Sequence, residues 1–238
     1  MVARGHEGDP AAGGGHRHPA DRAARIAEWD ARYAEAERTW SGRPNEALVA
    51  ELADEPPGRV LDVGCGEGAD AVWLASRGWE VTAIDVSAVA LRRARAAAEA
   101  SGVRVTFLQL DLADAGALGA FDAVSACYAP LDKSPGRDAE RALAGAVAPG
   151  GVLLWVHHAD VDRARAAEHG FDPDDYLSDA DVLAALEADR AAGWVVETHA
   201  RRARHVTEGA GAHHRDDVVV RARLGRVSPP DAPPRPAF

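Results

Sequence analysis

Two carboxylates flank a glycine-rich turn in the first half of the chain, and together they are suited to a nucleoside ligand that carries positive charge. The turn contains three alternating glycines, Gly64, Gly66 and Gly68. Because glycine has no β-carbon and tolerates positive φ, a ligand can approach the backbone closely there. Asp62 lies two residues before the first glycine, and Asp85 ends the next apolar run. An ionised Asp62 suits an ammonium or sulfonium group, and Asp85 is placed to accept hydrogen bonds from both hydroxyls of a ribose.

A dinucleotide is the main competing ligand for this turn. Gly64, Gly66 and Ala69 also satisfy the pattern of two close glycines and a later small residue that holds a pyrophosphate. Asp62 argues against it, because an ionised carboxylate beside the turn repels a pyrophosphate. The extra Gly68 also argues against a dinucleotide. We further expect no second domain, which a hydride-transferring enzyme would need to hold its substrate. The residues therefore favour S-adenosylmethionine over a nicotinamide dinucleotide.

The segment 60–68 and Asp85 resemble the first motif and its acidic partner in class I S-adenosylmethionine-dependent methyltransferases. The resemblance extends from about Trp29 to Leu224. Two lead-in stretches, 29–33 and 40–45, resemble the entry segment of the small-molecule branch related to thiopurine and tellurite methyltransferases. The resemblance implies a Rossmann-like fold, S-adenosyl-L-methionine as cofactor, and in-line transfer of a methyl group to S, N, O or a heavier chalcogen of a small molecule.

Further cofactor contacts are expected where the parallel strands end, because an open α/β sheet binds ligands beyond the carboxyl ends of its strands. By resemblance to the family, Asp111 accepts a hydrogen bond from the adenine amino group, Leu112 touches the ring, and Val86 flanks its other side. The alternative for Asp111 is a helix cap. The expected cofactor-binding residues are Asp62, Gly64, Cys65, Gly66, Gly68, Asp85, Val86, Asp111, Leu112 and Cys127.

Three residues at the ends of two later strands are candidates for the acceptor side. Tyr128 follows the predicted strand 121–127, which lacks the Asn/Asp-Pro-Pro-aromatic run resembling amino-directed nucleic-acid methyltransferases. Tyr128 is thus a candidate substrate contact, with core packing as the alternative. His157 and His158 follow the next strand, and either could remove a proton from the acceptor or serve as a structural hydrogen-bond partner. An acceptor that is already anionic needs no base.

Aromatic residues recur at helical spacing near the start of the chain, which predicts an amphipathic helix at 21–37. A second short helix is expected at 45–53. In related methyltransferases the segment before the first strand folds over the cofactor. Trp29, Tyr33 and Trp40, with Tyr128, are therefore candidates for a substrate-facing lid, and plain packing is the alternative for the helix.

Strands and helices alternate after this segment. Apolar runs predict strands at 59–63, 81–85, 103–109, 121–127, 151–156, 194–203 and 214–224, and alanine-rich patterns predict helices at 69–77, 88–101, 136–148 and 179–190. Alternation of this kind predicts one α/β sheet of seven strands, mostly parallel, with helices on both faces. The last two strands form a hairpin, so the last strand is expected to be antiparallel. Pro149 is expected to end the preceding helix.

Composition limits the organisation and the partners. With 238 residues, of which 47% are hydrophobic, we expect a flexible tail at 1–20, a helical lid segment at 21–57, one methyltransferase domain at 58–225 and a flexible proline-rich tail at 226–238. A net charge of −11 disfavours nucleic acid and favours a small-molecule substrate. No apolar run approaches the ~20 residues that span a bilayer, so no membrane partner and a cytoplasmic location are expected.

The remaining charged and sulfur-containing residues receive structural interpretations. Cys65 and Cys127 are the two cysteines and form no disulfide framework. We expect no metal site. Solvated surface charge is the interpretation for Asp174, Asp175, Asp216, Asp217, Arg92, Arg93 and Arg95. Two functions from other classes remain open: a catalytically silent module that binds S-adenosylmethionine, and a nicotinamide-dependent oxidoreductase.

Overall fold

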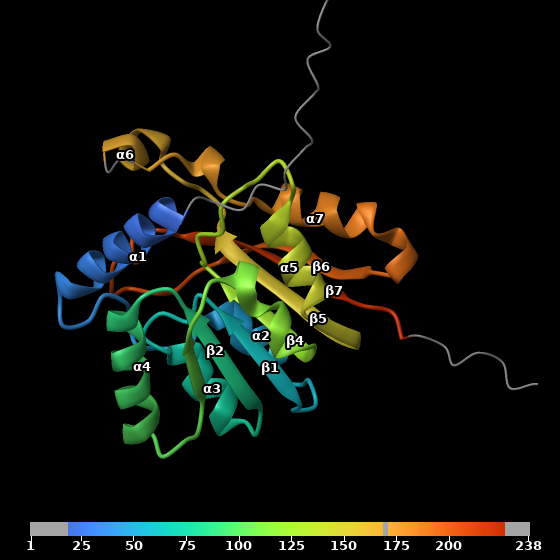
Figure 1. Cartoon of the computed structure of the whole chain (residues 1–238), viewed down its shortest axis with the longest axis horizontal. Helices are drawn as coiled ribbons and strands as arrows, with labels where there is room; N and C mark the ends of the chain where they lie inside the picture. Colours follow the sequence, from blue (N-terminus) through green and yellow to red (C-terminus); the bar gives the residue numbers. More distant parts are fainter. Residues whose placement is uncertain (1–18, 169–170, 227–238) are drawn as a thin grey trace, which may run out of the picture.

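The computed structural model of the chain describes residues 19–168 and 171–226, which fold around one sheet of seven strands (Figure 1). The strands are β1 (Arg59–Val63), β2 (Glu80–Asp85), β3 (Thr106–Gln109), β4 (Phe121–Cys127), β5 (Val147–His158), β6 (Val195–Ala203) and β7 (Asp216–Arg223). Their order is β3-β2-β1-β4-β5-β7-β6, and β7 runs antiparallel to both of its neighbours. The predicted mostly parallel α/β fold with an antiparallel last strand is confirmed. The tails predicted at 1–20 and 226–238 lie outside the described residues, except at 19–20 and 226.

Helices cover both faces of the sheet. They are α1 (Pro19–Ala34), α2 (Glu46–Leu52), α3 (Ala69–Ser76), α4 (Ala88–Ala100), α5 (Asp138–Gly145), α6 (Arg163–Glu168) and α7 (Asp179–Ala188), with 3-10 turns η1 (Leu112–Leu118), η2 (Pro173–Asp175) and η3 (Arg190–Ala192). Side chains alternate across a strand, so Val60 packs with α2, α3 and α4, whereas Leu61 packs with η1, α5 and α7. No helix of the described residues is long and apolar enough to cross a membrane.

Strand β5 differs from the prediction at its start. It begins at Val147, whereas the predicted helix ran to 148 and the predicted strand began at 151. Pro149 does not separate the two elements, because it lies where the pairing of β5 with β4 is irregular, between the partners of Phe121 and Ala123. The strand also stays paired on its other side, since the Gly150 amide donates to the carbonyl of Leu224 at 2.9 Å.

The carboxyl ends of β1, β2, β4 and β5 meet at one edge of the sheet, because these strands are parallel. Strand β7 runs the opposite way, so its first residues reach the same edge, and Asp217 pairs with His158 in the ladder. Figure 1 shows α1 at this end of the molecule, beyond the arrowhead of β5. Helix α1 is tied to the start of α4 by Asp30, whose carboxylate accepts from the Ser87 hydroxyl at 2.6 Å and the Val89 amide at 3.1 Å.

Candidate functional site

A cavity of about 790 Å³ opens at the carboxyl edge of the sheet, below α1 and the segment 204–214. This volume lies within the range of pockets that hold cofactors and small ligands. All predicted site residues line it: Trp29, Tyr33, Trp40, Asp62, Gly64, Cys65, Gly66, Gly68, Asp85, Val86, Asp111, Leu112, Cys127, Tyr128, His157 and His158. The structure therefore brings all of these residues together at one edge of the sheet, and their roles stay predictions.

The glycine turn at 64–68 needs glycine for space as well as for its backbone conformation. Gly66 has φ of 53°, and a β-carbon there would stand 2.9 Å from the hydroxyl of Tyr33. Gly68 has φ of 84°, and a β-carbon there would stand 2.8 Å from the β-carbon of Ala94 on α4. Both distances are shorter than ordinary contacts. The turn is consequently held between the N-terminal segment on one side and α4 on the other.

Asp85 fixes this turn from the end of β2. Its carboxylate accepts from the amide of Gly66 at 2.9 Å through one oxygen and from the amide of Ser87 at 2.8 Å through the other. Each carboxylate oxygen has a second lone pair, so both remain able to accept from a ligand. Burial raises the pKa of Asp85, and the two amides oppose that rise.

Asp62 carries a buried carboxylate oxygen that has no partner. Its Oδ1 accepts from the hydroxyl of Ser125 at 3.1 Å, whereas its Oδ2 has no hydrogen-bond partner in the structure. Asp62 is 2% exposed, and burial together with the nearby Asp70 and Asp85 raises its pKa well above the ordinary range. An unpartnered buried carboxylate oxygen is costly, and it marks a place for a donor from a ligand.

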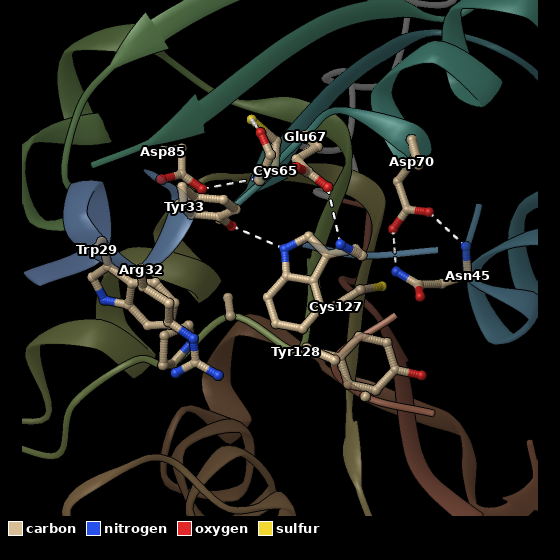
Figure 2. Close-up of a pocket in the computed structure, with 18 of the residues that line it drawn as sticks. Trp29, Arg32, Tyr33, Asn45, Cys65, Glu67, Asp70, Asp85, Cys127 and Tyr128 are labelled. Atoms are coloured by element: carbon tan, nitrogen blue, oxygen red, sulfur yellow. Dashed lines mark hydrogen bonds between the residues drawn. The ribbon is translucent and has the colours of Figure 1, made fainter. Parts of the chain in front are cut away.

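Asp70 adds a third buried carboxylate to this side of the cavity. It accepts from the backbone amide of Asn45 at 2.7 Å and from the Asn45 side chain at 2.6 Å, as Figure 2 shows. Within the described residues, no arginine, lysine or histidine forms an ion pair with Asp62, Asp70 or Asp85. Three buried carboxylates without a cationic side chain give this part of the cavity a strong preference for a positively charged ligand.

Glu67, in the middle of the turn, anchors the N-terminal segment. Its carboxylate accepts from the amides of Thr39 and Trp40, each at 3.0 Å, and from Arg93 at 2.7 Å. Arg93 also donates to the carbonyls of Tyr33 at 2.7 Å and Ala36 at 2.5 Å. The prediction that Arg93 belongs to a solvated face is wrong, because the segment after α1 folds over this part of α4.

Three aromatic side chains form the underside of the N-terminal segment. The Trp40 indole donates to the Tyr33 hydroxyl at 3.1 Å, and the two rings meet edge to face. Trp29 lies 6.1 Å from Tyr33, ring to ring, and carries Arg32 above its own ring. Burial raises the pKa of Tyr33, so its hydroxyl stays neutral. The predicted lid residues are thus assembled over the glycine turn, and their part in ligand exchange stays a prediction.

Asp111 has both oxygens engaged by the protein. Oδ1 accepts from the amide of Ala113 at 3.1 Å, which caps the turn η1, and Oδ2 accepts from Arg25 at 2.7 Å. Arg25 also forms an ion pair with Asp132, so it joins α1 to two loops of the body. The helix-cap alternative for Asp111 is therefore part of its role. Its adenine contact stays a prediction that uses the remaining lone pairs.

Behind Tyr128 and His158, which line the cavity, lies a buried carboxylate for which the sequence predicted no part in a site. Asp217 is 5% exposed and accepts from the hydroxyl of Tyr128 at 2.5 Å, and the Nδ1 atom of His158 lies 3.2 Å from its other oxygen. The prediction of solvated charge is wrong for Asp217, because β7 inserts between two strands and buries this residue against β5. Its neighbour Asp216 forms an ion pair with Arg201 at 2.7 Å.

His157 differs from His158 in its surroundings. It is half-buried beside Trp155, with the two rings stacked at 5.6 Å, and desolvation lowers its pKa to about 4. The described contacts give it no carboxylate partner comparable to Asp217. His157 consequently stays neutral at physiological pH, and its ring forms part of the cavity lining.

Comparisons with known proteins agree with this geometry. Residues 60–151 match the family described as a methyltransferase domain. The chain is 32% identical over 139 residues to a ribosomal RNA small subunit methyltransferase C of Chromohalobacter salexigens, over 56% of this chain and 41% of that protein. It is 34% identical over 157 residues to a ubiquinone biosynthesis O-methyltransferase of Xanthomonas oryzae, over 61% of this chain and 62% of that protein. The chain thus spans only part of the curated relatives it matches.

A solved structure resembles nearly the whole fold. It is described as "Conversion of a Disulfide Bond into a Thioacetal Group during Echinomycin Biosynthesis", and it shares 28% identity with this chain. The match covers 85% of this chain and 94% of the other, with a TM-score of 0.65. The similarity therefore extends well beyond the residues 60–151 that match the methyltransferase domain.

Proposed function

We propose that this chain is a class I S-adenosylmethionine-dependent methyltransferase that transfers a methyl group to a small-molecule acceptor, because residues 60–151 match a methyltransferase domain and the cavity suits this cofactor. The observation that carries the proposal is the unpartnered Oδ2 of Asp62, in a part of the cavity where the buried carboxylates of Asp62, Asp70 and Asp85 have no ion pair with a cationic side chain of the described residues. A positively charged ligand that also offers donors satisfies both features.

The residues of the cavity can hold each part of this ligand. Asp62 accepts from the amino group at its free oxygen, and Asp85 accepts from the ribose hydroxyls through its remaining lone pairs. Val86 and Leu112 enclose the adenine, whose amino group donates to Asp111. When bound, S-adenosylmethionine supplies an electrophilic methyl carbon and a neutral leaving group. The chain contributes orientation and exclusion of water, which can supply roughly 7–11 kcal/mol of a barrier in favourable cases.

Several features support a small acceptor. The net charge of −11 opposes a long phosphate backbone. The names of two matched proteins refer to biosynthesis, one to that of ubiquinone and the other to that of echinomycin. The match to the ribosomal RNA methyltransferase covers 41% of that protein. It therefore supports a shared cofactor more strongly than it supports an RNA acceptor for this chain. The acceptor atom is S, N, O or a heavier chalcogen.

The continuity of the cavity favours an enzyme over a silent binding module. A silent module requires Trp29, Tyr33 or Tyr128 to close the mouth above the methyl group. Here the same cavity is lined by the glycine turn at one end and by His157 and His158 at the other. A nicotinamide dinucleotide fits less well, because its pyrophosphate would meet the carboxylates around Asp62.

Calorimetry with S-adenosylmethionine, its demethylated product and NADH tests the cofactor. We expect the first two to bind and NADH neither to bind nor to compete. Asp62→Asn should weaken binding at least tenfold, since it removes the charge that faces the amino group. The matched control is Asp122→Asn, which alters an exposed carboxylate bound to the Arg59 amide at 2.8 Å. Binding of NADH alone, or equal effects of the two variants, would contradict the proposal. Methyl transfer to a panel of thiols, phenols, amines and chalcogen anions separates an enzyme from a silent module.

A further inference from the structure

Asp217 organises the acceptor end of the cavity. Its side chain is 7% exposed and lies against Tyr128 at one oxygen and His158 at the other. The Nε atom of Arg204 lies 3.7 Å from the oxygen that Tyr128 binds. An ionised carboxylate has no proton to give, so both neighbours must donate to it. The proton of neutral His158 is thereby fixed on Nδ1, and the lone pair is fixed on Nε2.

The Nε2 side of His158 faces the loop that covers the cavity. A β-carbon on Gly211 would stand 3.7 Å from Nε2, and the His214 ring stacks on the His158 ring at 3.6 Å. The Tyr128 ring stacks on the other face at 4.5 Å. His158 is held from both faces and at Nδ1, while it and its neighbours line the cavity. A base must be held in this way to meet a reacting proton with fixed geometry.

The groups around His158 keep it neutral. Burial lowers its pKa, Arg204 and His213 lower it further, and Asp217 opposes them. His214, stacked above, has its own pKa lowered to about 4 by burial and by His158. The groups that face His158 are Asp217 from β7, Arg204 after β6, Tyr128 after β4, His157 on β5, and His213 and His214 in the covering loop. A neutral imidazole can accept a proton throughout the physiological range.

Tyr128 is held in an uncommon conformation. Its φ is 55°, in the left-handed region that side chains other than glycine seldom adopt. The short bond from its hydroxyl to Asp217 and the stacking on His158 fix it there. In Figure 2, Tyr128 lies on the far side of the cavity from Asp85. Backbone strain of this kind is retained where the surrounding contacts require it, and it accumulates at functional sites.

We propose that His158 is the general base of this enzyme, that Asp217 and Tyr128 position it, and that the acceptor is a nucleophile that must lose a proton, such as a phenol, an alcohol or an ammonium group. The inference rests on the methyl-transfer function proposed above. The acceptor's X–H proton moves to Nε2, and the electron pair left on X forms the bond to the methyl carbon. The electrons of the breaking C–S bond stay on sulfur, and the His158 proton later returns to solvent.

Nuclear magnetic resonance of the imidazole nitrogens tests this arrangement without turnover. In the cofactor-free protein we expect His158 to carry its proton on Nδ1 and to titrate below the ordinary histidine range. Asp217→Asn removes the charge that favours the imidazolium, so the His158 pKa should fall further. Tyr128→Phe removes a donor from Asp217 and leaves more negative charge facing His158, so the pKa should rise. The matched control is Asp216→Asn, one residue away, because Asp216 is paired with Arg201. This variant should leave both the proton position and the pKa of His158 unchanged.

Kinetics test the chemical role. His158→Gln should lower kcat at neutral pH by a hundredfold or more, since general-base catalysis contributes roughly 10²–10⁴ where a proton must leave. Asp217→Asn should lower kcat less, and should move the acidic limb of the pH profile to lower pH, which a merely structural role would not do. The control is His199→Gln, which breaks a second His–Asp pair, to Asp179 at 2.9 Å, on the outer part of the same sheet. That variant should keep wild-type activity.

Affinity for S-adenosylmethionine separates the possible failures. If the wild-type protein does not bind the cofactor, both the proposed function and the assignment of His158 as general base are refuted. If it binds and transfers methyl groups but His158→Gln keeps more than a tenth of kcat, only the base assignment is overturned. If Asp217→Asn does not fold, Tyr128→Phe carries the test, because an unmoved or lowered His158 pKa in that variant would refute the positioning network.

Discussion

The guanidinium of Arg93 lies 2.7 Å from the carboxylate of Glu67, and this ion pair joins the glycine turn, helix α4 and the segment after α1. Arg93 also binds two carbonyls of that segment, at Tyr33 and Ala36. We expect the segment or the turn to move when the cofactor enters or leaves, because these contacts hold the segment over the glycine turn. The stability of this junction should then affect the rate of ligand exchange.

Arg93→Gln should loosen the N-terminal segment without unfolding the domain. We expect faster dissociation of the demethylated cofactor and faster hydrogen exchange at Thr39 and Trp40, whose amides bind Glu67. Stopped-flow fluorescence of the tryptophans and amide hydrogen exchange measure these two effects. Arg92→Gln is the control, because Arg92 is exposed and contacts only its own helix in the described hydrogen bonds. Equal dissociation rates for both variants would show that the junction does not limit exchange.

Gly66→Ala should disturb the contact between the turn and the lid. The β-carbon would stand 2.9 Å from the Tyr33 hydroxyl and 3.4 Å from the Trp40 indole nitrogen. Gly102→Ala is a matched control, since Gly102 has a similar φ of 67° and nothing within 4 Å of such a carbon. Both changes cost roughly 1–2 kcal/mol for the left-handed backbone. Thermal unfolding should show a further loss, about 1–3 kcal/mol, for Gly66→Ala alone.

Asp62→Asn should make the free protein more stable at alkaline pH. A carboxyl group whose pKa is raised on folding binds its proton more tightly in the folded protein, so its contribution is fully present below the ordinary value of 3.8 and is lost as the pH rises through the raised pKa. At about pH 8 the wild-type protein carries this penalty and the variant does not. The difference in Tm between the two should therefore shrink on acidification toward about pH 5. A difference that grows on acidification would mean that Asp62 is held in its charged form.

Asp85→Asn should weaken cofactor binding through the ribose and not only through the turn. The loss of charged hydrogen bonds to a buried partner costs about 1–3 kcal/mol. The Asp85 carboxylate also holds the amides of Gly66 and Ser87, so the single variant mixes two effects. Calorimetry with a 2′-deoxy analogue of the demethylated cofactor isolates the ribose term, because the analogue should lose affinity for the wild-type protein and not for the variant. Additive losses would refute the ribose contact.

Local patterns in the sequence predicted the sheet and the residues that line the cavity around the glycine turn. The glycines at 64–68 and the carboxylates Asp62 and Asp85 follow apolar runs directly, so their place at strand ends can be deduced from spacing alone. The start of β5 could not be deduced in this way. Pro149 ends helices in most contexts, and only the irregular pairing with β4 lets it lie inside a strand.

The errors among the charged residues have a common cause. Arg93 and Asp217 have sequence neighbours typical of exposed positions, yet each is covered by a segment distant in the chain. Arg93 contacts Tyr33 and Ala36, which precede it by 60 and 57 positions in the sequence. Asp217 contacts His158, which precedes it by 59 positions. Burial produced by such contacts leaves no periodic signal in the sequence around the residue. The one clue for Asp217 was its place at the start of a strand predicted to be antiparallel.

The reversed direction of β7 divides the cavity between two lengths of chain. The proposed cofactor contacts before β4 come from the loop after β1, the end of β2 and the loop after β3, whereas the proposed acceptor end comes from Tyr128, His158 and the residues around Asp217. The loop 204–215 enters and leaves the site through a hairpin, so its length and composition can vary without altering any parallel crossover. We therefore expect replacement of this loop to change acceptor preference while the residues around the glycine turn stay in place. Exchange of this hairpin between relatives is a practical route to enzymes with new acceptors.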